Sequence, residues 1–191
     1  YGDFDVTGDE KTIEYTYEPN SERYVVGKPT ATAAYAGVGT SGQLLSKSVV
    51  VYDAAGRPES TSPWDDANQR WLTATMSYDA WGNLIRECDS ANACVSHTID
   101  STYHRFVVAT TNPLGHSNSS TWDPVCGVKM SATDANGQTV NTQYDALCRP
   151  VRTDLPGGAF ELRSYNAFGD PNGQNVEVQT PAMDGSGGAV W

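Results

Sequence analysis

A turn signal recurs every 11 residues in the middle of the chain, and this spacing limits the folds that the sequence can adopt. Each signal joins a bulky or β-branched residue to Asp or Asn, followed by Gly or Pro. Asp and Asn suit turn entry because their side chains hydrogen-bond the backbone two residues on, and Gly supplies the positive φ that such turns need. The four signals lie at 111–115, 122–127, 133–137 and 144–149.

Turns at this spacing leave segments of about five to seven residues between them, which is the ordinary length of a β-strand. The segments 128–133 and 138–144 are rich in Val, Thr and other residues that favour strands. A fixed internal period also marks a repeat architecture. We therefore predict an all-β fold of antiparallel β-hairpins, with the turns along a common rim and with no substantial helix.

The period extends more loosely toward both ends of the chain. Further turn signals occur at 52–58, 78–84, 88–92, 99–101 and 165–171. Strands are also expected at 11–17, 23–26, 30–35, 43–52, 71–78 and 176–180, and an irregular insertion at 59–70. The predicted organisation is a lead-in of β-strands over 1–50, a repeat region over 51–175, and a last strand with a Gly-rich tail over 176–191. The chain begins at Tyr1 without a Met, so we expect a piece of a longer protein.

Three signals share a longer pattern of Tyr-Asp, two variable residues, Gly, and then Arg or Asn. They stand at 52–58, 78–84 and 144–150, although Cys148 replaces Gly in the third, and a related copy has Asn166 in place of Asp. The pattern resembles the core of RHS/YD-repeat proteins over roughly residues 50–175. The finer resemblance is to the B-component of bacterial insecticidal toxin complexes and to virulence-plasmid-type proteins. The segments 1–3, 8–10 and 184–187 also support this resemblance. The repeat-core positions are Tyr52, Asp53, Gly56, Tyr78, Asp79, Gly82, Trp122, Asp123, Gly127, Asp134, Gly137, Tyr144, Asp145, Tyr165 and Gly169.

The resemblance implies a sector of a curved shell, in which an antiparallel sheet of YD repeats encloses a toxic polypeptide until delivery. It implies a non-catalytic function, a secreted or cell-surface bacterial location, and partners in the remaining shell and its cargo. The self-cleaving aspartates of the family have no match here, so no catalytic residue is assigned. The alternative is an extracellular adhesion module that binds carbohydrate or a receptor, as the related shell of teneurins does in adhesion. A hydrolase is the third hypothesis.

Four cysteines allow two disulfides in an exported protein. Cys88 and Cys94 flank one predicted turn and could staple a single hairpin. Cys126 and Cys148 are 22 residues apart, which is two repeat periods, so they could face each other across stacked turns. Free buried thiols remain the alternative for both pairs.

Composition argues against several partners. The net charge is -11, whereas nucleic acids and anionic membranes bind basic surfaces, so we expect neither as a partner. No apolar run approaches the ~20 residues of a membrane helix, so no membrane insertion is expected.

No cofactor or metal is expected either. Residues 37–42 match G-x-G-x-x-G, but a strand-like segment follows instead of the helix that dinucleotide binding requires. The set Cys88, Cys94, His97 and His104 lacks zinc-finger spacing. The Asp residues at 65–66, in 3–5 and in the tail 184–188 are too few in each place for a calcium site.

The aromatic residues that lead the turn signals have two interpretations. Tyr or Trp rings can stack on sugars, but aromatic pairs across strands also stabilise sheets by about 0.2–1 kcal/mol each. We favour the packing interpretation. No nucleophile motif or metalloprotease motif occurs, and the abundance of Asp is already explained by turns.

Overall fold

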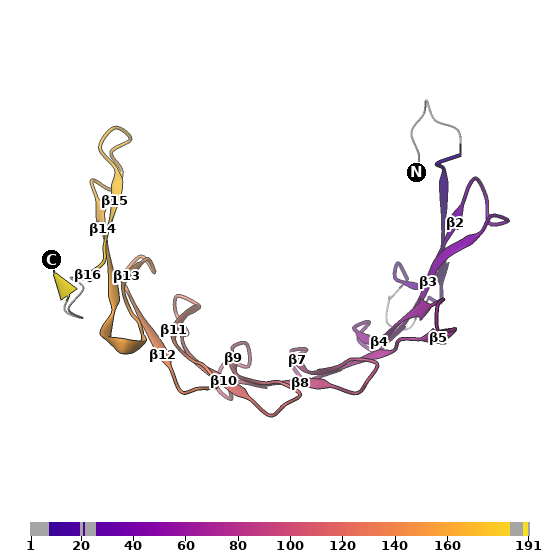
Figure 1. Ribbon diagram of the computed structural model, residues 1–191, viewed down its shortest axis with the longest axis horizontal. Helices are drawn as coiled ribbons and strands as arrows, with labels where there is room; N and C mark the ends of the chain where they lie inside the picture. Colours follow the sequence, from indigo (N-terminus) through magenta and orange to yellow (C-terminus); the bar gives the residue numbers. More distant parts are fainter. Residues whose placement is uncertain (1–7, 20, 22–25, 184–188, 191) are drawn as a thin grey trace. The chain divides into compact units, whose positions relative to one another are not determined.

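The computed structural model describes residues 8–19, 21, 26–183 and 189–190 (Figure 1). The expected strand at 23–26, apart from Val26, and the motifs at 1–3 and 184–188 lie outside these residues. Where the chain is described it is all-β, and its one helical element is the 3₁₀ turn η1 (Pro156–Gly158). The strands are β1 (Lys11–Tyr17), β2 (Pro29–Ala36), β3 (Leu44–Tyr52), β4 (Pro58–Asp65), β5 (Arg70–Trp71), β6 (Ala74–Tyr78), β7 (Leu84–Cys88), β8 (Cys94–Ile99), β9 (Val107–Thr111), β10 (Ser117–Asp123), β11 (Val128–Thr133), β12 (Thr139–Tyr144), β13 (Pro150–Asp154), β14 (Phe160–Asn166), β15 (Asn175–Gln179), β16 (Ala182–Met183) and β17 (Ala189–Val190).

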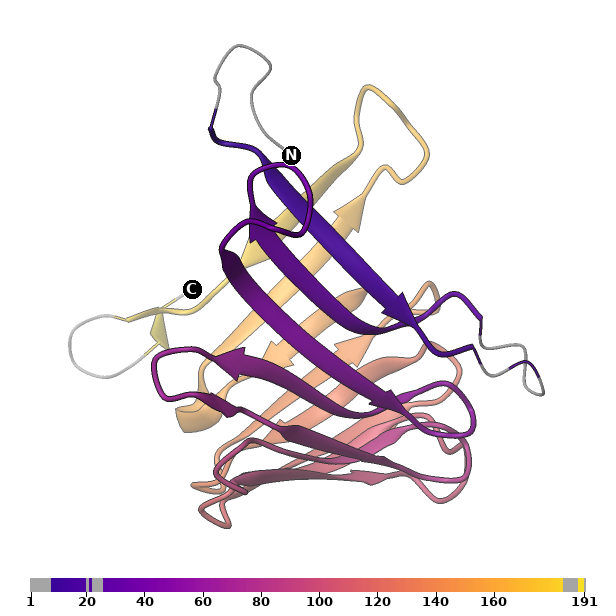
Figure 2. The same ribbon diagram turned by 90° about the vertical axis from the view of Figure 1, so that its right-hand side faces the viewer.

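Strands β1 to β15 form one antiparallel sheet whose order follows the sequence, except that the short β5 pairs only with β4. Strands β16 and β17 pair with each other in a separate two-stranded sheet. Figure 2 shows successive strands of the main sheet lying side by side. The prediction of an all-β fold built from antiparallel hairpins is therefore confirmed.

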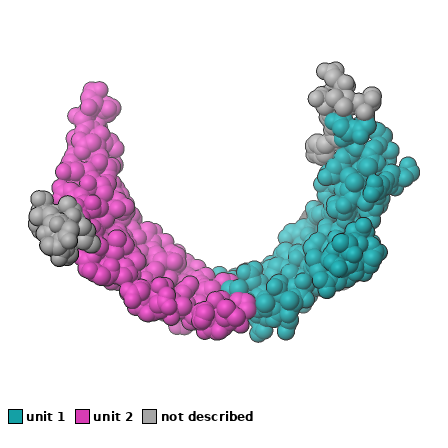
Figure 3. Space-filling model, viewed as in Figure 1, with its two compact units in different colours: residues 1–96 teal, residues 97–191 magenta. Residues whose placement is uncertain are grey.

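The chain divides into two compact units, residues 1–96 and 97–191, which Figure 3 shows in teal and magenta. Apart from β5 and the separate β16–β17 pair, consecutive strands in each unit are antiparallel neighbours, so successive turns alternate between the two edges of the sheet. In the second unit the turns at 123–127 and 145–149 share one edge, while those at 112–116 and 134–138 lie on the other. The expectation of a single common rim was therefore wrong, because turns 11 residues apart point in opposite directions.

Two further expectations were wrong between residues 58 and 78. The predicted insertion at 59–70 is mostly the regular strand β4, and the predicted strand at 71–78 is broken between β5 and β6. Two prolines hid β4 from sequence reasoning, since proline lacks the N–H that an interior strand needs. In the structure Pro58 is the first residue of β4, and Pro63 lies at the last pairing position with β3.

The described part of the chain has almost no buried core. Only Ala34, Cys88 and Phe106 are buried hydrophobic residues there. Within each unit, the element pairs with many contacts are neighbours in the sheet, so each unit contributes a single layer. A sheet usually buries one face against a second layer, which supplies most of a domain's hydrophobic stabilisation. Strand pairing and turn contacts must therefore contribute an unusually large part of the stability here.

One turn geometry recurs throughout the sheet. The Oδ1 atom of the first turn residue accepts hydrogen bonds of 2.8–3.0 Å from the backbone N–H groups two and four residues later. The residue three positions later has positive φ and closes the turn onto the first carbonyl. A bond from the first N–H to the fifth carbonyl completes this turn. The first residues are Asp53, Asp79, Asp89, Asn112, Asp134 and Asp145, and the positive-φ residues are Gly56, Gly82, Asn92, Gly115, Gly137 and Cys148.

The positive φ at these turns makes a specific substitution destabilising. We expect Gly137→Ala, at φ 79°, to lower the free energy of unfolding by about 1–2 kcal/mol, because an L-residue is strained in the left-handed region. Gly27→Ala is the matched control, because neither glycine has a neighbour within 4 Å of an added Cβ and Gly27 lacks the positive φ. Chemical denaturation of both variants measures the difference, and equal midpoints would contradict this account.

Candidate functional site

The candidate site is the set of contacts around the lead aromatics, defined as Tyr52, Tyr78, Trp122, Tyr144 and Tyr165. All lie in the last two residues of a strand, directly before a turn. Each of the register shifts in the described strand pairs comes immediately before an aromatic residue, including the first four lead aromatics. A bulge can redirect the side chain that follows it, so the shifts contribute to the direction of these four rings. No register shift precedes Tyr165 in its pairing with β15.

Each lead aromatic donates a hydrogen bond to a backbone carbonyl of the preceding strand. The five bonds measure 2.8–3.1 Å and reach the first or second residue of that strand. An aromatic side chain therefore ties the end of one strand to the start of its neighbour. The pairs are Tyr52–Pro29, Tyr78–Pro58, Trp122–Val107, Tyr144–Lys129 and Tyr165–Pro150.

An arginine at the end of the turn links two successive turns of one edge. In the first unit, Arg57 pairs with Asp53 of its own turn at 2.7 Å, and its guanidinium carbon lies 4.6 Å from the centre of the Tyr78 ring. The second unit repeats this arrangement: Arg149 pairs with Asp145 at 2.6 Å and lies 4.2 Å from the centre of the Tyr165 ring. We name this Asp–Arg–aromatic arrangement the turn clamp.

Other side chains cover the remaining lead aromatics. The ring of Phe106 stacks on Trp122 at a centroid distance of 5.2 Å, and Lys129 lies 5.3 Å from the Trp122 ring. Lys28 lies 5.5 Å from the Tyr52 ring and donates to the Gly56 carbonyl. A cation or ring over an aromatic face contributes on the order of 0.5–1.5 kcal/mol. These contacts support the packing interpretation of the lead aromatics.

The hydrogen bonds of the turns lower the pKa of several aspartates. The backbone N–H of Arg57 is the main cause of the lowered pKa of Asp53, and the Arg149 side chain is the main cause at Asp145. The Asn83 amide has the same effect on the pKa of Asp79.

Asp100 begins a longer turn and has the largest change in pKa. Desolvation alone would raise the pKa of Asp100, but the backbone N–H groups of Phe106, Tyr103 and Arg105 outweigh it and hold this pKa far below its ordinary value. All these aspartates are therefore ionised at neutral pH, and they accept the hydrogen bonds that shape the turns as carboxylates.

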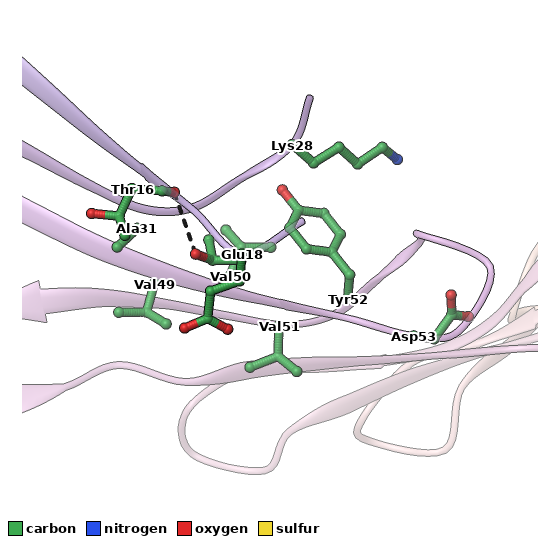
Figure 4. Close-up of a pocket in the computed structure, with 10 residues that line it drawn as sticks. Thr16, Glu18, Lys28, Ala31, Val49, Val50, Val51, Tyr52 and Asp53 are labelled. Atoms are coloured by element: carbon green, nitrogen blue, oxygen red, sulfur yellow. Dashed lines mark hydrogen bonds between the residues drawn. The ribbon is translucent and has the colours of Figure 1, made fainter. Parts of the chain in front are cut away.

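A hollow of about 470 Å³ lies beside Tyr52 in the first unit (Figure 4). Val49 and Val51 form its apolar part, while Lys28, Glu18 and Asp53 supply charged groups. Lys28 and Asp53 are engaged in turn contacts, through Gly56 and Arg57 respectively. Two of the three charged groups that line the hollow are thus already engaged in contacts within the protein.

Both cysteine pairs are disulfides in the structure. Cys88 and Cys94 are directly opposite in the pairing of β7 with β8, with a Cα–Cα distance of 4.0 Å. Cys126 and Cys148 join the turns at 123–127 and 145–149, with a Cα–Cα distance of 5.5 Å. These two turns are successive on one edge of the sheet. The second disulfide, like the turn clamp, therefore connects two hairpins that are neighbours along that edge.

Several residues considered for metal and dinucleotide sites have other contacts in the structure. Cys88 and Cys94 are bonded to each other, and His97 Nδ1 lies 3.1 Å from Thr110 Oγ1. In the described ranges, no group of three His, Cys, Asp or Glu side chains converges as metal ligands would. Residues 37–42 connect the antiparallel strands β2 and β3, which makes them a hairpin loop.

The structure places the other predicted residues in related turns. Asp123 Oδ1 accepts from the N–H groups of Val125 and Cys126, and the Gly127 N–H donates to the Asp123 carbonyl. Asp134 and Gly137 shape a turn on the opposite edge, away from the lead aromatics. Gly169 follows Tyr165 in the turn before β15. Sequence reasoning missed Arg57 and Arg149, although their place four residues after each Asp was a usable signal.

The fold matches segments of solved toxin-complex structures. The crystal structure of TcdB2-TccC3-TEV aligns with a TM-score of 0.59 at 12% identity, over 95% of this chain and 11% of that chain. The crystal structure of TcdB2-TccC3-Cdc42 aligns with a TM-score of 0.53 at 14% identity, over 87% of this chain and 10% of that chain. A mutant Tc holotoxin pore from Photorhabdus luminescens gives 0.55 at 14% identity, over 91% and 10%.

This chain has the fold of those Tc toxin segments. The likeness predicted from the repeat residues is thereby confirmed at the level of the fold. The chain spans about a tenth of the length of the solved chains that it matches. No protein-family model and no curated protein matches the sequence. Within the described residues, no helix has the length and apolar character needed to cross a membrane.

The hydrogen bond of a lead aromatic can be removed without changing the ring. We expect Tyr144→Phe to lower the free energy of unfolding by about 0.5–1.5 kcal/mol, because the 2.8 Å bond to the Lys129 carbonyl is lost. Tyr15→Phe is the control, since this exposed ring on β1 should change the free energy by less than about 0.5 kcal/mol. A loss of equal size in both variants, measured by urea denaturation, would argue against the role of Tyr144.

The lowered pKa values predict a loss of stability in acid. A carboxylate with a lowered pKa in the folded state stabilises the fold above its unfolded pKa of about 3.9, and this contribution disappears as the pH falls toward the folded pKa. We expect the thermal midpoint to drop progressively below about pH 4, and Asp100→Asn to reduce that slope. Glu59→Gln, which removes an exposed carboxylate from β4, should leave the slope unchanged in the same thermal scans.

Proposed function

We propose that this chain is a non-catalytic structural segment of an RHS/YD-repeat shell, which encloses a toxin or other cargo polypeptide for delivery. The observation that carries the proposal is the turn clamp, which occurs once in each unit and there links one hairpin to the next on the same edge. Such contacts between neighbours build a continuous wall. The fold likeness to Tc toxin segments supports the same conclusion.

The sheet has the properties of a wall segment. It is a single layer with little buried core, so it gains stability by extension along the strand order. Strands β1 and β15 end that order, and in the described residues each pairs with one sheet neighbour. An unpaired strand edge invites further pairing. The partners of the proposal are accordingly the adjoining strands of the parent shell and the cargo inside it.

The contacts favour a structural function over catalysis. Asp100 and Asp145 have lowered pKa values because they accept hydrogen bonds from their own turns, which gives both carboxylates a structural role. A secreted bacterial location fits this proposal, since the chain forms two disulfides.

The alternative of carbohydrate binding gains no support from the lead aromatics. Sugar stacking needs an open ring face, whereas rings or cations lie over Tyr52, Tyr78, Trp122 and Tyr165. The polar atoms of all five lead aromatics are also bonded to backbone carbonyls. Glycan binding therefore stays a prediction without a site.

The proposal can be tested on the natural protein that carries this segment. Electron cryomicroscopy should show β1 and β15 paired on both sides within a closed wall, and an enclosed polypeptide should resist added protease. Replacing Tyr144 and Asp145 with Ala should shorten that protection, while Tyr15→Phe should not. A separate lobe with solvent around both end strands, or protection unchanged by the double substitution, would refute the proposal.

A further inference from the structure

The two disulfides occupy different structural positions. Cys88–Cys94 lies within one hairpin, where strand pairing already holds the two residues opposite each other. Cys126–Cys148 joins the turns of two different hairpins, separated by 22 residues. Reduction of the first disulfide leaves its cysteines adjacent in the ladder. Reduction of the second removes a covalent link between turns that are not paired with each other.

Cys148 stands where four of the five other turns of this type carry glycine, the fifth having Asn92 at φ 62°. The φ of Cys148 is 61°, and the equivalent residues Gly56, Gly82, Gly115 and Gly137 have φ between 77° and 92°. The hydrogen bonds of its turn match those of the others, including the bond from the Cys148 N–H to the Asp145 carbonyl. A non-glycine residue in this region is strained, and surrounding structure must hold it there. The bond to Cys126 is a covalent restraint at this position.

The second disulfide joins two half-buried cysteines, whereas the first joins one half-buried cysteine, Cys94, to one buried cysteine, Cys88. Cys88 is only 8% exposed, and the Arg86 guanidinium lies 3.4 Å from its sulfur and 3.2 Å from that of Cys94. Cys126 and Cys148 are half-buried at exposed turns, where the adjacent Val125 and Leu147 are 91% and 59% exposed. A thiolate must reach a sulfur directly to exchange with it, so access favours attack at Cys126–Cys148.

We propose that Cys126–Cys148 is a reducible disulfide, named here the clasp, which a dithiol reductant opens selectively. Its opening loosens the edge of the second unit that carries the lead aromatics and the turns at 123–127 and 145–149. One thiolate of the reductant attacks a sulfur, forms a mixed disulfide and releases the other cysteine, which takes up a proton. The second thiol of the reductant then displaces the bound cysteine and leaves as a cyclic disulfide. The protein gains two electrons and two protons and now has two thiols.

Opening the clasp changes the turns at 123–127 and 145–149 in particular. Asp145 and Arg149 of the second turn belong to the clamp on Tyr165, so movement there weakens the link to the next hairpin. The clasp thereby makes the cohesion of this edge depend on the redox state of the surroundings. The hairpins of this edge are linked more strongly under oxidising conditions than in the presence of dithiols.

The test treats the full chain with increasing dithiothreitol, alkylates free thiols with iodoacetamide and locates them by peptide mass spectrometry. We expect Cys126 and Cys148 to be labelled at about tenfold lower dithiothreitol than Cys88 and Cys94, because one sulfur of the latter pair is buried. Amide exchange should then rise at 123–127 and 145–149, and the thermal midpoint should fall by about 5–10 °C. Labelling of Cys88 and Cys94 first or together with the other pair, or unchanged exchange, would overturn the proposal.

Variants separate the crosslink from the backbone strain. The double variant with Cys126→Ser and Cys148→Gly should lose the midpoint shift on adding dithiothreitol, while Cys88→Ser with Cys94→Ser should keep it. Glycine at 148 should also give a midpoint about 2–4 °C higher than serine at 148 in the same Cys126→Ser background, since φ there is 61°. Equal midpoints for those two variants would contradict the restraint on Cys148, and the chemical reduction of the unchanged chain does not depend on either variant folding.

Discussion

The hydrogen bonds accepted by one side-chain oxygen at each turn are the constraint on which the sheet depends. That oxygen holds the N–H groups two and four residues later, which fixes a short loop and the left-handed residue within it. Turn geometry fixes the register of the strands on either side. In a sheet without a second layer no packed core can correct a wrong register, so the turns must specify it locally.

The turn clamp adds a second level to this local specification. Asp53 and Asp145 each bind an arginine that reaches the aromatic ring of the next hairpin on the same edge. The aspartate thus shapes its own turn and also positions a cation over the next one. Because the clamp sits between half-exposed side chains, solvent screens its ion pair, and its ring contact and geometry matter more than its charge. The first unit and the second unit use the same solution independently.

Much of the fold could be predicted because its determinants are local. A bulky residue followed by Asp predicted turn signals at 52–58 and 78–84, where Gly follows, and at 144–150, where Cys148 replaces Gly. The structure has turns at 53–57, 79–83 and 145–149. The number of residues between Cys126 and Cys148 was also informative, since two strands bring the chain back to the same edge. The contacts of Arg57 and Arg149 could not be predicted in the same way, because each depends on where the ring of an aromatic residue in another hairpin points.

Sequence reasoning failed where a local rule has a structural exception. Pro58 and Pro63 argue against a strand in the sequence of β4. In the structure they lie at the first residue of β4 and at its last pairing position with β3, where a missing N–H is tolerated. Equal spacing suggested one rim, yet antiparallel geometry sends alternate turns to opposite edges. Cys148 has a backbone conformation that favours glycine, which the sequence marked only as a departure from the repeat.

The alternation of edges has a consequence for how such a chain can lengthen. Inserting one strand with its turn would move every later lead aromatic to the opposite edge. Inserting two strands, about 22 residues, keeps every later lead aromatic on its original edge. Duplication by hairpins is therefore neutral for the remainder of the sheet, whereas duplication by single strands is not. Whether the number of added strands is even or odd therefore decides which insertions this sheet can accept without moving its later lead aromatics.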